Sequence, residues 1–271
     1  MTKAWMLCAV LAMSAAIWSQ TTPPAKAPET PAAKHAPAAK TDAEFAAYKA
    51  VAQLPDPAAM EKGADDFAVK FPDSDLKGLL YKTVMRTYQG KNDAEKTEQM
   101  GRKVLALDGD DPEALVMVAE ILAERTRDTD LDKAQRYDEA MKLAQHATQT
   151  VDTDSGIPAG TPEDKAAAYR GLLLSNAYSV VGTLEFKQDK FAEAETNLRK
   201  SMDAFPQQPD PTVVLRLALS LDKQGKYPEA LKVAEQAVTL NQEGTGAGKI
   251  ARQERDRLVL LVGPAKPAEK K

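Results

Sequence analysis

Residues 211–241 read PTVVLRLALSLDKQGKYPEALKVAEQAVTLN, and this stretch decides the fold of the chain. Apolar residues recur at helical spacing on both sides of the turn Gly225-Lys226-Tyr227, which predicts two amphipathic helices that share one apolar face. One such pair cannot bury that face alone. The stretch therefore predicts a repeat that is stable only when it stacks on further copies of itself, as in a solenoid.

Small and large side chains in this stretch also fall at the positions of a known repeat. The matching residues are Leu217, Ala218 and Leu221 in the first helix and Tyr227, Ala230 and Ala237 in the second. By these positions the stretch resembles the tetratricopeptide repeat, a helix-turn-helix unit of about 34 residues. Alanines in the second helix would let the two helices approach within about 8–10 Å. The resemblance implies an all-α fold, a right-handed α-α superhelix, and a general role in binding proteins.

Four looser copies precede this repeat, over residues 42–72, 78–109, 112–152 and 175–206. The third copy carries an insertion between its helices, residues 126–135. The first helix of the fourth copy extends back to Pro162, because Thr161 and Pro162 form a typical helix start. We therefore expect about five helix pairs, which together with a capping helix fill residues 42–262.

The capping helix is expected over residues 246–262. Its inward side chains are predicted to be Ile250, Leu258 and Leu261, and its outward ones Arg252, Arg255 and Arg257. The composition agrees with an all-helical chain: 6% of the residues are aromatic and 43% apolar, and no run of alternating β-branched residues occurs. This pattern favours helices rich in alanine and leucine and argues against a sheet.

Charge is unevenly distributed along the chain, whose formal net charge is −4. The basic segments at residues 20–41 and 263–271 each carry +2 and Lys3 adds +1, so the array between them carries −9. An array this acidic is not expected to bind nucleic acid. Both basic segments are rich in proline and alanine, so we expect a disordered linker and a disordered tail, able to make at most a weak contact with an anionic envelope surface.

The N-terminus predicts export from the cytoplasm. Lys3 gives a short basic start, residues 4–17 are apolar, and a cleavage site precedes Gln20, so residues 1–19 are expected to form a signal peptide. The alternative, an uncleaved membrane anchor, needs about 20 apolar residues, and this stretch is shorter. Cleavage would also remove Cys8, the only cysteine. We expect a periplasmic or secreted protein with no membrane span after cleavage.

No motif predicts catalysis or a cofactor. The glycine-rich stretch 244–249 lacks the glycine and the Ser or Thr that a phosphate-binding loop needs, because Glu243 and Ile250 stand there. No Ser-His-Asp arrangement is visible, although distant residues could assemble one without a sequence trace. His146 has no other ligand at helical spacing. The prediction is a protein that is not an enzyme and that binds no cofactor.

One acidic stretch resembles a calcium-binding loop. The carboxylates with the required spacing are those of Asp128, Asp130, Asp132 and Glu139. The glycine that such a loop needs is replaced by Lys133, which resists the sharp turn and brings positive charge. The alternative is that Thr129 caps the following helix, with acidic residues in its first turn. We favour the helix cap and leave calcium binding open.

The resemblance also implies where a partner binds. In tetratricopeptide-repeat proteins the first helix of each repeat lines the concave face. Carried onto this sequence, the candidates are Lys82, Arg86, Gln89, Glu113, Glu120, Glu124, Asn176, Ser179 and Thr183, with Val116, Phe186, Leu215, Leu219 and Asp222 completing the face. The carboxylate clamp of chaperone-binding members is absent. Alternatively, Lys82 and Arg86 only screen Glu113 and Glu120 on the neighbouring helix.

Two functions follow from these expectations. The first is a non-catalytic scaffold in the bacterial cell envelope, which holds a peptide or a helix of a partner protein in its groove. The second is an accessory module that binds a substrate or small molecule for an envelope enzyme or export complex. A long open polar groove would favour the first, and one closed apolar pocket the second. The sequence favours the scaffold, because no repeat places a cluster of aromatic residues on the concave face.

Overall fold

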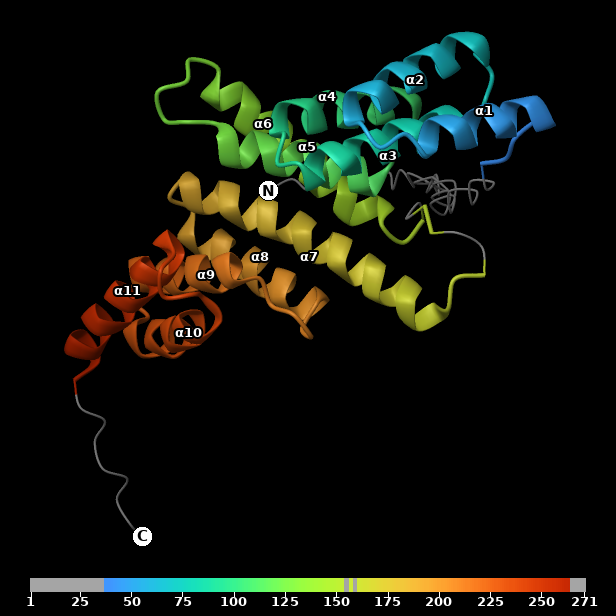
Figure 1. Cartoon of the computed structure of the whole chain (residues 1–271). Coiled ribbons are helices and arrows are strands. Elements are labelled where there is room, and N and C mark those ends of the chain that lie inside the picture. Colours follow the sequence, from blue (N-terminus) through green and yellow to red (C-terminus); the bar gives the residue numbers. More distant parts are fainter. Residues whose placement is uncertain (1–36, 154–155, 158–159, 264–271) are drawn as a thin grey trace, which may run out of the picture. The chain divides into compact units, whose positions relative to one another are not determined.

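The computed structural model describes residues 37–153, 156–157 and 160–263, and these residues form helices and no strands (Figure 1). The helices are α1 (Asp42–Ala52), α2 (Pro57–Lys70), α3 (Leu76–Gly90), α4 (Ala94–Leu107), α5 (Pro112–Arg125), α6 (Lys133–Thr150), α7 (Glu163–Lys187), α8 (Phe191–Ala204), α9 (Pro211–Lys223), α10 (Tyr227–Leu240) and α11 (Gly246–Val262). The predicted signal peptide, most of the predicted linker and the tail beyond Gly263 lie outside these residues.

Consecutive helices pack as five pairs, from α1 with α2 to α9 with α10, and α11 packs on α10 and α9. Odd-numbered helices also pack on one another, α1 on α3, α5 on α7 and α7 on α9, whereas the described even-numbered helices make no comparable contact among themselves. The odd-numbered helices therefore form one layer and the even-numbered helices the other. This arrangement confirms the predicted all-α solenoid of five helix pairs and a capping helix.

Asp-Pro pairs define the start of three helices. They are Asp56-Pro57 at α2, Asp111-Pro112 at α5 and Asp210-Pro211 at α9, and each aspartate side chain accepts a hydrogen bond from a backbone N–H of the first turn. Proline suits the first helical position because its missing N–H would have no partner there. The sequence thus fixes where three of the helices begin, and with them the position of their inner faces.

Small residues lie where the two helices of a repeat cross. Ala194, Ala230 and Ala237 have no exposed surface, as the repeat pattern predicted. Gly101 lies in α4, and a Cβ atom at this position would lie 2.7 Å from Cγ2 of Val118. Such a separation is far inside van der Waals contact, so the close approach of α4 to α5 requires glycine.

In the capping helix the structure confirms Leu258 as an inward residue and corrects Ile250 and Leu261. Ala251 and Leu258 are fully buried, whereas Ile250 and Leu261 are 47% and 50% exposed. Arg257 is exposed, as predicted, and forms ion pairs with Asp222 and Glu254. The phase is set at the helix start, where Gly248 packs tightly on the carbonyl of Gln242 and donates to the side chain of the N-cap.

The start of α6 is also corrected. The helix begins at Lys133 with Asp132 at its N-cap position, so Thr129 does not cap it. Two consecutive turns precede the helix instead, closed by hydrogen bonds from the N–H of Asp130 to the carbonyl of Arg127 and from the N–H of Lys133 to the carbonyl of Asp130. The insertion is therefore a turn-containing loop.

The boundary between the linker and the array lies slightly earlier than predicted. Thr41 is the N-cap of α1, and Lys40 donates its N–H to the carboxylate of Glu44 and its ammonium to the carbonyl of Asp73. These contacts join residues 40 and 41 to the first repeat. Among the described helices, none combines the length and the apolar character needed to cross a membrane.

Candidate functional site

A partly open cavity of about 230 Å³ lies in the layer of odd-numbered helices, here called the inner layer, between the first helices of the third, fourth and fifth repeats. Its lining consists of Glu120, Ala123 and Glu124 from α5, Asn176, Ser179, Val180 and Thr183 from α7, and Asp210, Thr212 and Arg216 at the start and middle of α9. The structure therefore brings together five of the predicted site residues: Glu120, Glu124, Asn176, Ser179 and Thr183. Three consecutive repeats contribute to one polar surface.

Three carboxylates and one guanidinium dominate the electrostatics of this cavity. The guanidinium of Arg216 donates to Oε1 of Glu124 at 2.7 Å and to Oγ1 of Thr183 at 3.0 Å, so it links α9 to both other helices. The carboxylate of Asp210 accepts from the N–H of Thr212 at 2.6 Å and thereby caps α9. Arg216 is thus already engaged, and the cavity keeps an excess of negative charge.

Glu120 differs from the other two acids. It lies at the groove surface, yet enough protein surrounds its carboxyl group that desolvation raises its pKa, and the negative charges of Glu124 and Asp210 raise it further. Arg216 opposes this shift without cancelling it. Among the described residues, the carboxylate of Glu120 forms no hydrogen bond or ion pair. The charged form of Glu120 therefore lacks a close partner on this side of the groove.

The residues predicted for the inner face of α9 do not line the cavity. Leu215 is 5% exposed and packs with Ala237 and Ala251, and Asp222 pairs with Arg257, so neither belongs to the cavity. Thr212 and Arg216 occupy the inner face instead. A signal was present, because Arg216 is the only charged residue among the first eleven of α9. A single charge within an apolar helix marks the side that faces water.

Lys82 is not a groove residue. Its side chain is 9% exposed and forms an ion pair with Asp111, whose own side chain is 7% exposed. The second oxygen of Asp111 accepts from the N–H of Ala114 at the start of α5. The prediction had placed Lys82 beside Glu113 and Glu120, but the buried N-cap of the next repeat lies closer. This pair therefore contributes to the contact between repeats.

Arg86 and Glu113 form an ion pair, as expected from the alternative that Arg86 only screens an acid on the neighbouring helix. Nε and Nη2 of Arg86 donate to the two carboxylate oxygens of Glu113, both at 2.5 Å, and the hydroxyl of Tyr169 donates to Oε2 of Glu113 at 3.0 Å. Burial raises the pKa of Tyr169, and the adjacent Glu113 raises it further. α3, α5 and α7 are thus linked by this trio. Gln89 is exposed on α3 and does not line the cavity.

Comparison with known proteins agrees with this geometry. The family model described as tetratricopeptide repeat matches residues 215–248, which span the second half of α9, all of α10 and the start of α11. This stretch is a tetratricopeptide repeat. The match lies in the stretch whose sequence decided the fold, although it begins four residues later than the repeat delimited from the sequence.

A solved structure has the same fold. PilF of Pseudomonas aeruginosa is 18% identical, with 84% of this chain and 95% of that chain covered and a TM-score of 0.51. A thermophilic tetratricopeptide-repeat protein of Thermus thermophilus is 12% identical, with 80% of this chain and 99% of that chain covered and a TM-score of 0.45. No curated protein matches. At these identities the likeness shows the fold alone, and tetratricopeptide-repeat proteins generally mediate contacts between proteins.

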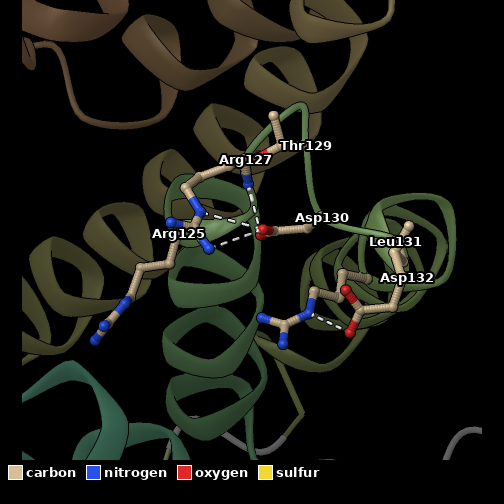
Figure 2. A pocket seen from close by; sticks show the side chains of 7 residues that line it. Arg125, Arg127, Thr129, Asp130, Leu131 and Asp132 are labelled. Atoms are coloured by element: carbon tan, nitrogen blue, oxygen red, sulfur yellow. Dashed lines mark hydrogen bonds and ion pairs between the residues drawn. The ribbon is translucent and has the colours of Figure 1, made fainter.

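The acidic residues of the calcium-loop pattern lie against separate cations. Asp130 accepts from Arg127, as Figure 2 shows. Asp132 accepts from Arg136, while Asp128 pairs with Lys133 and Glu139 with Arg102. The described residues include no group of three or more His, Cys, Asp or Glu side chains placed to hold a metal ion. The four carboxylates of the calcium-loop pattern therefore point to four different partners. His146 also has a partner, since its Nε2 lies 2.8 Å from Oδ1 of Asp110.

Proposed function

We propose that this chain is a non-catalytic scaffold that binds a segment of a partner protein along the inner face of its odd-numbered helices. The observation that carries the proposal is the polar cavity shared by α5, α7 and α9. Because three successive repeats contribute, an extended peptide or a helix lying across them would contact all three at once. The remaining inner-face residues, Arg86 and Gln89 on α3, would extend the contact surface.

The size and lining of the cavity favour this function over a small-molecule accessory module. Drug-sized ligands occupy pockets of roughly 300–1,000 Å³ that are mostly apolar. This cavity, at about 230 Å³, is smaller, and of its ten lining residues only Ala123 and Val180 are apolar. A cavity of this kind accommodates one side chain of a longer partner better than a whole small molecule.

Site-specific photo-crosslinking tests the groove. A benzophenone amino acid at Ser179, inside the cavity, is expected to capture one discrete partner in an extract of the cells that make the protein. The matched control is the same amino acid at Thr239, which is exposed on α10 in the other layer. Capture from Ser179 alone supports the groove. Equal capture from both positions, or capture from Thr239 only, assigns binding to the outer face and overturns the proposal.

The scaffold is proposed to work in the bacterial cell envelope, on the basis of the N-terminal pattern of Lys3 and residues 4–17. We expect the mature protein to begin near Gln20 and to fractionate outside the cytoplasm. Mass spectrometry of the purified N-terminal peptide checks the cleavage site. Recovery of the protein with Met1 intact in the cytoplasmic fraction would rule out both the signal peptide and an envelope role.

A further inference from the structure

The cavity between α5, α7 and α9 has more negative than positive charge, and its one cation is already occupied. Arg216 bonds Glu124 and Thr183, which leaves Glu120 and Asp210 without a cationic partner among the described residues that line the cavity. The hydrogen bonds that Asp210 accepts come from uncharged backbone N–H groups. Two carboxylates from different repeats therefore face a space that no cation among the described lining residues fills.

We infer that this cavity receives an arginine or lysine side chain of the partner segment, held between Glu120 and Asp210. The inference rests on the proposed function and names the chemistry that the groove selects. A basic side chain would supply the charge that the cavity lacks, and hydrogen bonds between a cation and a carboxylate are about twice as strong as neutral ones.

The other walls of the cavity suit the same side chain. Ala123 and Val180 offer apolar surface for the methylene stem, which basic side chains bury readily. The side-chain oxygens of Asn176, Ser179 and Thr212 can accept hydrogen bonds from N–H groups that the carboxylates leave unpaired. An acidic side chain would meet three carboxylates, which excludes the anionic partner groups that the carboxylate clamp of related proteins binds.

The raised pKa of Glu120 agrees with this assignment. Desolvation and two neighbouring negative charges disfavour its ionised form in the free protein. An arriving cation would stabilise that ionised form. Binding would therefore relieve an unfavourable charge distribution, which contributes to affinity for a basic group and gives nothing to a neutral side chain of the same shape.

The first experiment is an NMR titration of the full mature chain with the peptide Ac-Ala-Ala-Arg-Ala-Ala-NH₂, its lysine counterpart and its citrulline counterpart. Citrulline has the shape of arginine without its charge. We expect saturable shifts at Ser179 with the two basic peptides, and binding at least about tenfold weaker with citrulline. Equal shifts with citrulline, or no shift at Ser179 with either basic peptide, overturn the inference.

The second experiment uses the partner itself. In the Ser179 crosslinking protein, the double substitution Glu120→Gln and Asp210→Asn removes both charges and keeps their shapes, and asparagine caps helices about as well as aspartate. The control is Glu235→Gln, an exposed acid on α10. We expect the double variant to lose at least about tenfold in capture and the control to lose none.

The outcomes separate this inference from the proposed function. If the double variant captures the partner as well as the control does, the partner binds in the groove without a basic side chain in this cavity, and only the inference fails. If the unsubstituted protein gives no capture from Ser179, the proposed function itself fails. A melting curve of the double variant that matches the control shows that the loss of capture is not a loss of fold.

Discussion

Replacing Lys82 with glutamate is expected to lower the melting temperature by about 6–20 °C. The ammonium of Lys82 and the carboxylate of Asp111 are both more than nine-tenths buried, and they face each other between the second and third repeats. Breaking a buried ion pair by removing one partner costs about 3–5 kcal/mol of unfolding free energy, because the other charge stays buried without compensation. Glutamate adds repulsion to that loss, and it competes for the N-cap of α5.

Lys62→Glu is the matched control. Lys62 also pairs with an aspartate, Asp66, but both side chains are more than two-thirds exposed. The same reversal of charge is therefore expected to leave the melting temperature nearly unchanged, since water and salt screen exposed pairs. Circular dichroism melts of the two variants check the comparison. If Lys82→Glu melted at the same temperature as Lys62→Glu, Lys82 would be exposed and would again be a candidate groove residue.

The burial of Lys82 could not be predicted from the sequence pattern. The inner-face phase of α3 was correct for Arg86, whose pairing with Glu113 was one of the two interpretations of that charge. The burial of Lys82 depends on Asp111, an N-cap in the next repeat, and on how closely two repeats approach each other. Periodicity within one helix carries no information about that distance. A charge at a groove position can therefore be structural.

The buried side of a helix was predicted accurately where one face of the helix differs clearly from the others. In α10 the spacing of Ala230 and Ala237 fixed the buried side, and the structure confirms it. In α9 most residues are apolar, so several phases fit the pattern, and only Arg216 marked the side facing water. In α11 apolar residues lie on several sides, and the close packing of Gly248 selected the phase. The sequence offered no measure of that contact.

In the candidate site, too, the features that the sequence could not predict depend on distances between neighbouring repeats. The structure brings Glu120, Glu124, Asn176, Ser179 and Thr183 together in one cavity. The repeat pattern placed them on the same face because that face can be assigned within each first helix without any knowledge of the neighbouring repeat. That Arg216 is neutralised by Glu124 while Glu120 is left without a partner depends on contacts across three helices. The charge balance of the cavity, and hence the class of side chain it accepts, required the structure.

The second large effect is expected at Gly182, where α7 crosses α8. A Cβ atom at this position would lie 2.8 Å from Cγ of Leu198 and 3.1 Å from its backbone N. Leu198 is fully buried, and its backbone belongs to a helix, so neither group can move aside easily. Overpacking of this kind typically costs about 1–3 kcal/mol, and we expect Gly182→Val to lie near the upper end of that range.

Gly78→Val in α3 separates the steric effect from helix propensity. Apart from the chain neighbours and the adjacent backbone of α3 itself, no atom lies within 4 Å of a Cβ built at Gly78, and valine has a higher helix propensity than glycine. Gly78→Val is therefore expected to leave stability unchanged or raise it slightly, while Gly182→Val lowers it. In a solenoid each repeat contacts only its neighbours, so hydrogen exchange in the Gly182 variant should quicken in α7, α8 and the repeats beside them. Melting curves that coincide for the two variants, or faster exchange spread evenly over all five repeats, would show that α7 and α8 cross at a greater distance than the structure places them.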